Sequence, residues 1–396
     1  GLGMRSSVMV NPLNPAAYSL TPRQGFLFDF GVEGVNFYNR QQKYADGAQT
    51  TSRTSYNTFN FHDIAFQLPL ARRLGLGFSL TPYSSVGYRV SADEQSDDVW
   101  GNIGRVQYLY AGEGDLTEVK LGIGWEVVKR VSIGVAAQYY WGDIERTYQT
   151  VVSNNIVNGG SVNTVTGTDS YGISRIKMQL GLQADLIQSE RQVLTLGATY
   201  DMGGNLRPSV NQTVVNGDIY GTVVRGDTTR MALKLPVQLG VGLYYQNAKI
   251  AAGVDYIYQN WENNESPKSV PGAVNVAYKN TNTVKLGFEY TPNRMDIRNY
   301  LKRWSYRVGF RYGTYYQTFE GKTLSQYAVT AGFGMPVRFL GRSSIDFGVE
   351  FGQRGNDSPL RIDNRQIGLV RQRYVKFSLG LTLFGEDSWF VRYKYD

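Results

Sequence analysis

Apolar and polar residues alternate along most of this chain. In the segment 74–80, leucine and phenylalanine take one face, and glycine and serine take the other. This period of two is typical of a β-strand whose two faces meet different surroundings. The same alternation recurs at 119–127, 133–141, 176–182 and in later segments, and no stretch has a helical period of useful length. We therefore predict an all-β fold of about 14 strands.

The predicted connections between strands alternate in length. Short and mostly basic connections are expected at one end of the molecule, near 71–73, 128–130, 189–191, 247–249 and 339–342, with a longer one at 291–303. Longer polar loops are expected at the other end, at 39–55, 91–103, 146–168, 205–228, 262–280 and 355–367. Short turns, long loops and alternating strands of about ten residues together indicate an antiparallel outer-membrane β-barrel.

A soluble propeller or a large sandwich would also contain many alternating strands. A propeller would repeat a blade motif every 40–50 residues or so, and the sequence contains no such repeat. The predicted inward face is too polar and too rich in glycine for a dry protein core, so the apolar face must meet lipid. An even number of strands places both termini on the side of the short turns, the periplasm. We expect the bilayer and lipopolysaccharide as its surroundings.

Composition narrows the function classes further. The chain has 396 residues, no cysteine and one histidine, which excludes a disulfide scaffold, a thiolate metal site and a zinc site with several histidines. His62 is in phase with Ile64, Phe66 and Leu68, so we expect it on the outward face, where a catalytic triad is not expected. The net charge of +8 comes without a dense basic run. We expect no enzyme activity, no cofactor and no nucleic-acid partner.

Pro82 interrupts the third predicted strand at a position where a ladder N–H group is needed. A proline in a paired strand belongs at an edge, a strand start or a bulge, and it biases Thr81 toward extended backbone. The polar run from Tyr83 to Ser85 can satisfy backbone groups that such a break frees. A proline near the loop end of a long strand would also be tolerated without any function.

Four segments resemble the long-chain fatty-acid transporter family of outer-membrane proteins. LNPAAYS at 13–19 resembles the family's Asn-Pro-Ala motif. LPVQLGVGLYY and the following AGVDYIYQNW, within 235–261, resemble its Leu-Pro strand and the hairpin after it. VKLGFEYTPN at 284–293 and TAGFGMP at 330–336 resemble two later strands, and all four segments follow the family's order.

The resemblance implies a transmembrane barrel of 14 strands at 25–385 and a hatch, or plug, at 1–24 in the lumen. Asn14, Pro15 and Ala16 match the hatch motif, and we expect the Asn14 side chain to fix a turn by bonding its own backbone. The tail at 386–396 departs from a chain that ends on a strand-terminal aromatic residue. It resembles members of the family from Bacteroidota, in which a short periplasmic tail follows the barrel.

The resemblance also implies a function. In this family the third strand carries an inward kink that opens a gap in the barrel wall, and hydrophobic cargo leaves sideways into the bilayer. We therefore expect passive transport of hydrophobic or amphiphilic, fatty-acid-like small molecules, with a lateral gate at Thr81, Pro82 and Tyr83. Such transport needs no cofactor and no energy coupling.

Basic side chains on the predicted inward faces are candidates for contact with an anionic cargo. Arg307 and Arg311 share one such face, and a guanidinium can bind a carboxylate in a bidentate manner. We add Lys376 to this candidate substrate-binding set. Acidic side chains are predicted on the same faces, at Asp29, Glu33, Glu126, Asp185, Asp255, Glu289, Asp346 and Glu350. The alternative is therefore a wall of mutually paired charges that holds the N-terminal segment in place.

Repeated glycines on the predicted inward faces, at 75, 77, 122, 124, 240, 242, 332 and 334, leave volume for a plug or a passage. A second hypothesis comes from a different class of function: a docking barrel within an outer-membrane machine for protein secretion or assembly. Relatives of this fold in Bacteroidota are implicated in type IX secretion, and the tail fits a contact in the periplasm. Its partners would be other outer-membrane or periplasmic proteins.

Overall fold

The computed structural model describes residues 1–22, 25–45, 48–94, 97–153, 162–217, 222–230, 233–262, 276–337, 343–362 and 365–386. The expected C-terminal tail lies outside these residues except for Glu386, which ends the last strand. The hatch motif and the residues around Pro82 lie within them.

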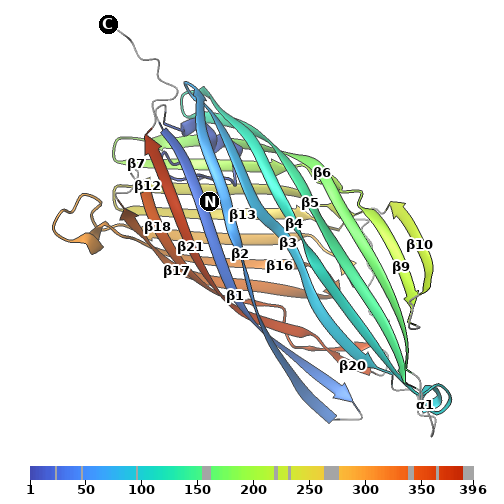
Figure 1. Ribbon diagram of the computed structural model, residues 1–396. Helices are drawn as coiled ribbons and strands as arrows, with labels where there is room; N and C mark the ends of the chain where they lie inside the picture. The colour runs from blue at the N-terminus through green and yellow to red at the C-terminus, as the bar shows by residue number, and fades with distance from the viewer. Residues whose placement is uncertain are drawn as a thin grey trace.

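Within the described residues, fourteen strands close an antiparallel barrel (Figure 1). In order around the wall they are β1 (Gly25–Ala45), β2 (Ala48–Ala71), β3 (Leu74–Asp93), β4 (Arg105–Val128), β5 (Val131–Ser153), β6 (Val162–Gln188), β7 (Gln192–Asp201), β12 (Val237–Asn247), β13 (Ile250–Asn260), β15 (Thr281–Tyr290), β16 (Ser305–Phe319), β17 (Lys322–Val337), β18 (Ser343–Arg354) and β21 (Val370–Glu386). β21 pairs with β1 from Gly25↔Glu386 to Gln41↔Val370, which closes the barrel. The predicted all-β barrel is confirmed.

Shorter strands and helical turns lie outside the set of fourteen barrel strands. β9 (Ser209–Asn216) pairs with β6 and with β10 (Thr222–Arg230), and β14 (Val276–Tyr278) pairs with β16. Two short ladders join β8 (Gly204–Asn205) to β11 (Lys234–Leu235) and β19 (Pro359–Ile362) to β20 (Arg365–Gly368). The helical turns are η1 (Pro15–Leu20), α1 (Asp97–Asn102) and η2 (Tyr300–Arg303). Among the described residues, no helix has the length and apolar character needed to cross a membrane.

Alternation along each strand separates the two faces of the wall. In β16, Tyr306, Val308 and Phe310 are exposed on the outside, while Arg307 and Arg311 contact side chains of other strands on the inner side. The predicted short connections near 71–73 and 128–130 are also confirmed, because only residues 72–73 separate β2 from β3 and only residues 129–130 separate β4 from β5. The connection predicted at 339–342 lies outside the described residues. An apolar outer belt on a closed barrel is the arrangement that a strand needs in lipid.

Several expected polar loops are strands instead. The expected loop at 39–55 lies in a β1–β2 ribbon that stays paired to Ala45↔Ala48. The expected loop at 146–168 is largely a β5–β6 ribbon, which stays paired to Ser153↔Val162. Hairpins that extend beyond the bilayer have water on both faces, so backbone pairing continues while the apolar alternation disappears. The loop prediction failed because it relied on that alternation.

Candidate functional site

The N-terminal segment, residues 1–22, packs against the inner side of the wall. Asn14 caps the η1 turn, because its side-chain oxygen accepts from the Ala16 N–H at 3.1 Å, as predicted. The Asn14 amide also donates to the carbonyls of Leu2 at 3.0 Å and Leu182 at 3.1 Å. Pro15 and Ala16 are buried beside it. One amide therefore joins two parts of the segment to β6.

Wall glycines leave the space that this segment occupies. The Tyr18 side chain is 0% exposed, and a Cβ added at Gly77 would overlap its ring. A Cβ at Gly122 would lie 3.0 Å from the ring's Cε2 atom, and one at Gly181 would overlap the Asn14 oxygen. Glycine in these strands therefore permits close approach of the segment. Gly334 has a different role, since a Cβ there would meet Asp346 and Arg307 of the wall.

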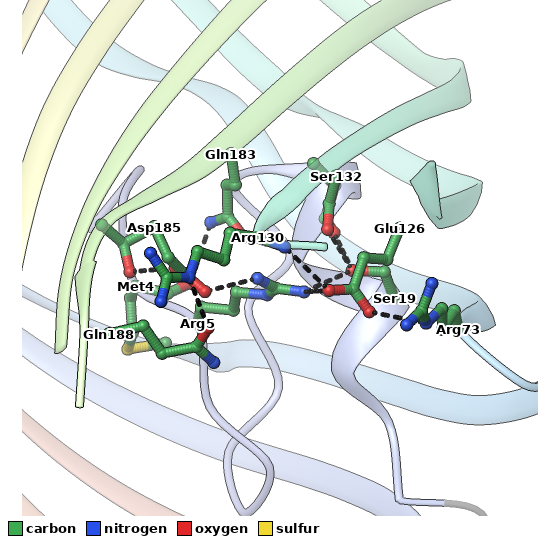
Figure 2. A network of polar contacts seen from close by, with 12 residues as sticks. Met4, Arg5, Ser19, Arg73, Glu126, Arg130, Ser132, Gln183, Asp185 and Gln188 are labelled. Atoms are coloured by element: carbon green, nitrogen blue, oxygen red, sulfur yellow. Dashed lines mark hydrogen bonds and ion pairs between the residues drawn. The ribbon is translucent and has the colours of Figure 1, made fainter. Parts of the chain in front are cut away.

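Arg5 is the main electrostatic anchor of the N-terminal segment (Figure 2). Its guanidinium is 2.8 Å from the Asp185 carboxylate and 3.9 Å from Glu126. Asp185 also accepts from the Thr195 hydroxyl at 2.7 Å. Gln183 adds hydrogen bonds from its amide to the carbonyls of Leu2 and Met4. Asp185 and Glu126 face inward as predicted, and they bind the chain's own arginine.

Sequence reasoning did not identify Arg5 as a site residue. The sequence did contain a sign of its role, since Arg5 is the only charged side chain among residues 1–22. Buried carboxylates need a cationic or hydrogen-bonding partner, so a lone arginine beside several predicted inward acids was a candidate. Asp255 is a second anchor, because its carboxylate accepts from the Leu2 N–H at 2.9 Å.

The β2–β3 ladder stops next to Pro82. Its last pair is Ile64↔Leu80, although β3 continues to Asp93. The rest of β3 pairs with β4, with an irregularity between Pro82 and Ser84. Among the described strands, none pairs with β3 on its β2 side beyond Leu80. In Figure 1 the β1–β2 ribbon diverges from β3 over this stretch.

A chamber of about 260 Å³ with a mixed polar and apolar lining borders this part of the wall. Thr81 and Tyr83 line it, and the Tyr83 ring meets the Tyr140 ring edge-on with centroids 4.8 Å apart. Half of its other lining residues are charged or amide-bearing, namely Glu118, Lys120, Gln138, Lys177, Gln179, Asp201, Gln238, Asp255, Gln259 and Lys285. Asp201 accepts from two of these amides, each at 3.1 Å. This chamber suits water and polar groups rather than a purely hydrocarbon surface.

The three candidate cargo-binding cations already have carboxylate partners. Arg307 contacts Glu289 at 2.7 Å and also Asp346. Arg311 lies 2.9 Å from Glu350, and the Tyr374 hydroxyl bridges the same two groups. Lys376 lies 2.9 Å from Glu33. Each pair joins neighbouring or next-nearest strands, so these charges stabilise the wall, and cargo binding by them stays a prediction.

The prediction that the His62 side chain lies on the outward face of the barrel is wrong. A register shift between Gly31 and Val32 of β1 pairs Gly31 with Asp63 and Val32 with Phe61, so His62 is an extra residue in β2. The bulge changes the phase of the strand. His62 therefore lines a lumen cavity of about 610 Å³, with its Nδ1 atom 2.8 Å from Asp63. The sequence period alone contains no sign of this extra residue.

Several solved structures have a similar fold. A FadL homologue from Pseudomonas aeruginosa is 13% identical, with a TM-score of 0.62 and coverage of 93% of this chain and 92% of that chain. The toluene transporter TodX of Pseudomonas putida is 15% identical, with a TM-score of 0.59 and 96% of each chain covered. The toluene transporter TbuX of Ralstonia pickettii is 14% identical, with a TM-score of 0.51 and 96% of each chain covered.

These similarities establish the FadL-like fold that the sequence resemblance indicated. A search of curated proteins finds no significant match. A family model described as BamG matches residues 1–396. Since that match extends over the entire chain, the protein belongs to the BamG family.

Proposed function

We propose that this chain is an outer-membrane barrel that lets hydrophobic or amphiphilic small molecules pass by passive diffusion. In this proposal cargo enters from the end with the long ribbons and leaves sideways at Thr81, Pro82 and Tyr83. The observation that supports it is the end of the β2–β3 ladder at Ile64↔Leu80, two residues before Pro82. The solved structures of similar fold include a FadL homologue and two toluene transporters, which also supports transport rather than catalysis.

The lining of the lumen favours an amphiphile over a pure hydrocarbon. Lys120 donates to the Pro12 carbonyl at 3.1 Å and lies 3.4 Å from Glu118, so the chamber beside Thr81 contains fixed charges. A cargo with a polar head and an apolar tail can place the head among these groups while its tail approaches the wall. Arg307, Arg311 and Lys376 can serve a carboxylate only by sharing it with their present partners.

The β1 and β21 ends pair with each other at the end of the barrel that has the short connections. We place this end in the periplasm and the long ribbons outside the cell, as is usual for outer-membrane barrels. In this orientation the lateral exit would open toward the bilayer on the side of the wall that β2 and β3 share.

Single-cysteine labelling tests the lateral exit, because the chain has no cysteine of its own. Thr81→Cys would be expressed in cells that lack their own fatty-acid transporter and then modified with a bulky charged thiol reagent. We expect uptake of labelled oleate to fall to the level of cells without the barrel. Val329→Cys, on the outer face of β17, is the control and should transport normally after the same labelling. Normal uptake by labelled Thr81→Cys would rule out this exit.

A second candidate function is a docking subunit of an outer-membrane protein secretion or assembly complex. It is favoured by the ion pairs of Arg307, Arg311 and Lys376, which leave the wall internally neutralised rather than poised for an anionic cargo. Purification from native membranes without cross-linking distinguishes the two functions. A stoichiometric protein partner together with background oleate uptake would support docking, and oleate uptake by the barrel alone would support transport.

A further inference from the structure

The β15–β16 connection, residues 291–304, folds back over the outer wall of the barrel. The Trp304 ring stacks on Phe333 of β17, with centroids 5.0 Å apart and planes 14° apart. The Tyr300 hydroxyl donates to the Pro336 carbonyl at 2.8 Å, and the Tyr306 hydroxyl donates to the Leu301 carbonyl at 3.1 Å. Figure 1 shows the connection protruding beyond the strand ends. Its aromatic side chains therefore rest on the lipid-facing surface.

Local hydrogen bonds hold two apolar side chains away from the protein. The Asp296 carboxylate accepts from the backbone N–H groups of Arg298 at 2.9 Å and Asn299 at 2.8 Å. Asn299 caps η2 by accepting from the Leu301 N–H. Met295, directly before the Asp296 turn, is 85% exposed, and Ile297, within that turn, is 95% exposed. An ordered connection that presents such side chains beside the bilayer can place them in the lipid interface.

An apolar groove of about 490 Å³ lies on the adjoining outer wall. It arises because Ala331 of β17 is flanked by Val308 of β16 and Val349 of β18, and this small side chain leaves a depression between larger ones. Aromatic rings border the groove, at Phe288, Tyr290, Tyr306, Phe333 and Phe347. Tyr306 and Phe333 also contact the connection, so the groove and the connection are continuous.

The connection is positively charged. It contains Arg294, Arg298, Lys302 and Arg303 and only one acid, Asp296, so its net charge is four minus one, +3. Arg294 lies 3.5 Å from Glu289 and Lys302 lies 3.8 Å from Asp296. Among the described residues, no carboxylate is within ion-pair distance of Arg298 or Arg303. Arg303 lies over the Tyr300 ring, 5.4 Å from its centroid, which leaves its N–H groups available for an anion. Two guanidinium groups without carboxylate partners, on a connection that adjoins an apolar groove, match an anionic head attached to an acyl chain.

We propose that the groove and the connection together bind one anionic phospholipid of the periplasmic leaflet. An acyl chain occupies the groove over Ala331, the phosphate contacts Arg298 and Arg303, and Met295 and Ile297 enter the bilayer interface. This assignment rests on the orientation given under the proposed function, in which the short connections face the periplasm. A lipid is favoured over a protein partner because the aromatic contacts seat the connection on the lipid-facing wall.

Native mass spectrometry of the purified full chain tests this site, with phosphatidylglycerol and phosphatidylethanolamine as probes. We expect the native sequence to retain one phosphatidylglycerol more tightly than phosphatidylethanolamine. Arg298→Gln with Arg303→Gln should weaken retention of phosphatidylglycerol by about fivefold for each charge removed. Ala331→Leu fills the groove and should weaken both lipids, while Val329→Leu, on the same outer face outside the groove, should weaken neither. Heat-modifiable migration in gels checks that each variant is folded.

Equal retention of the two lipids by the native sequence would overturn the proposal, and so would unchanged retention by the double arginine variant. Loss of a copurifying periplasmic protein in Met295→Ser with Ile297→Ser, with lipid retention unchanged, would assign the connection to a protein contact instead. The oleate assay with Thr81→Cys does not depend on this site. Failure of the lipid site and failure of the transport proposal are therefore distinguishable.

Discussion

Gly77→Ala tests whether wall glycines hold the N-terminal segment in place. The added Cβ would overlap the Cζ, Cε1 and Cε2 atoms of the fully buried Tyr18 ring. Because the Tyr18 side chain is 0% exposed, the ring is enclosed by its neighbours and cannot move away from the added methyl group without displacing them. Overpacking of a filled site costs about 1–3 kcal/mol. We expect the free energy of opening of residues 1–22 to fall by this amount.

Hydrogen exchange measures the effect directly. Exchange of amides in residues 1–22 should accelerate roughly fivefold to a hundredfold in Gly77→Ala, because each 1.4 kcal/mol or so corresponds to a factor of ten. Gly287→Ala in β15 is the matched control, since a Cβ there meets no atom within 4 Å. In a Tyr18→Ala background the Gly77→Ala change should have little further effect. Equal effects of Gly77→Ala with and without the Tyr18 ring would refute the proposed contact.

Two further predictions concern charges. Arg5→Met should destabilise the N-terminal segment by about 3–5 kcal/mol, since it leaves the buried Asp185 carboxylate without its cation. Arg40→Met removes the more exposed ion pair with Asp357 and should lower local stability by only about 0–1 kcal/mol. Hydrogen exchange in both variants checks this, and similar losses would contradict it. Backbone N–H groups of Asn299 and Arg298 lower the pKa of Asp296 below its usual value. The ionised Asp296 carboxylate therefore stabilises the turn at pH values above the usual aspartate pKa of about 3.9. This stability is lost as the pH falls through the lowered pKa of Asp296 in the folded protein. Amide protection at Arg298 should decrease on acidification in the native chain and much less in Asp296→Asn, and equal pH profiles would exclude this role.

The sequence predicted the barrel because lipid imposes a strict alternation on each strand that crosses it. The predictions of His62 and of the loop at 39–55 failed where a strand departs from this alternation. His62 sits in a bulge, which adds one residue to β2 without any compositional sign and reverses the expected side. The β1–β2 ribbon continues where alternation has ended, because backbone pairing does not require apolar side chains. The partners of Arg307 and Arg311 depend on which strands are neighbours across the register, so residue type alone could not select Glu289 or Glu350.

The position of residues 1–22 also constrains the order in which the molecule folds. Leu2 bonds Asp255, Arg5 bonds Asp185, and Asn14 bonds Leu182, so these contacts join residues 253, 180 and 168 positions apart in the chain. Residues 1–22 precede β6 and β13 in the chain, and they therefore cannot dock until those strands exist. The wall becomes continuous only when β21 pairs with β1, the strand that directly follows this segment. If residues 1–22 dock before β1 and β21 pair, they do not have to thread into a closed barrel, so closure of β1 on β21 is expected to be a late step of biogenesis.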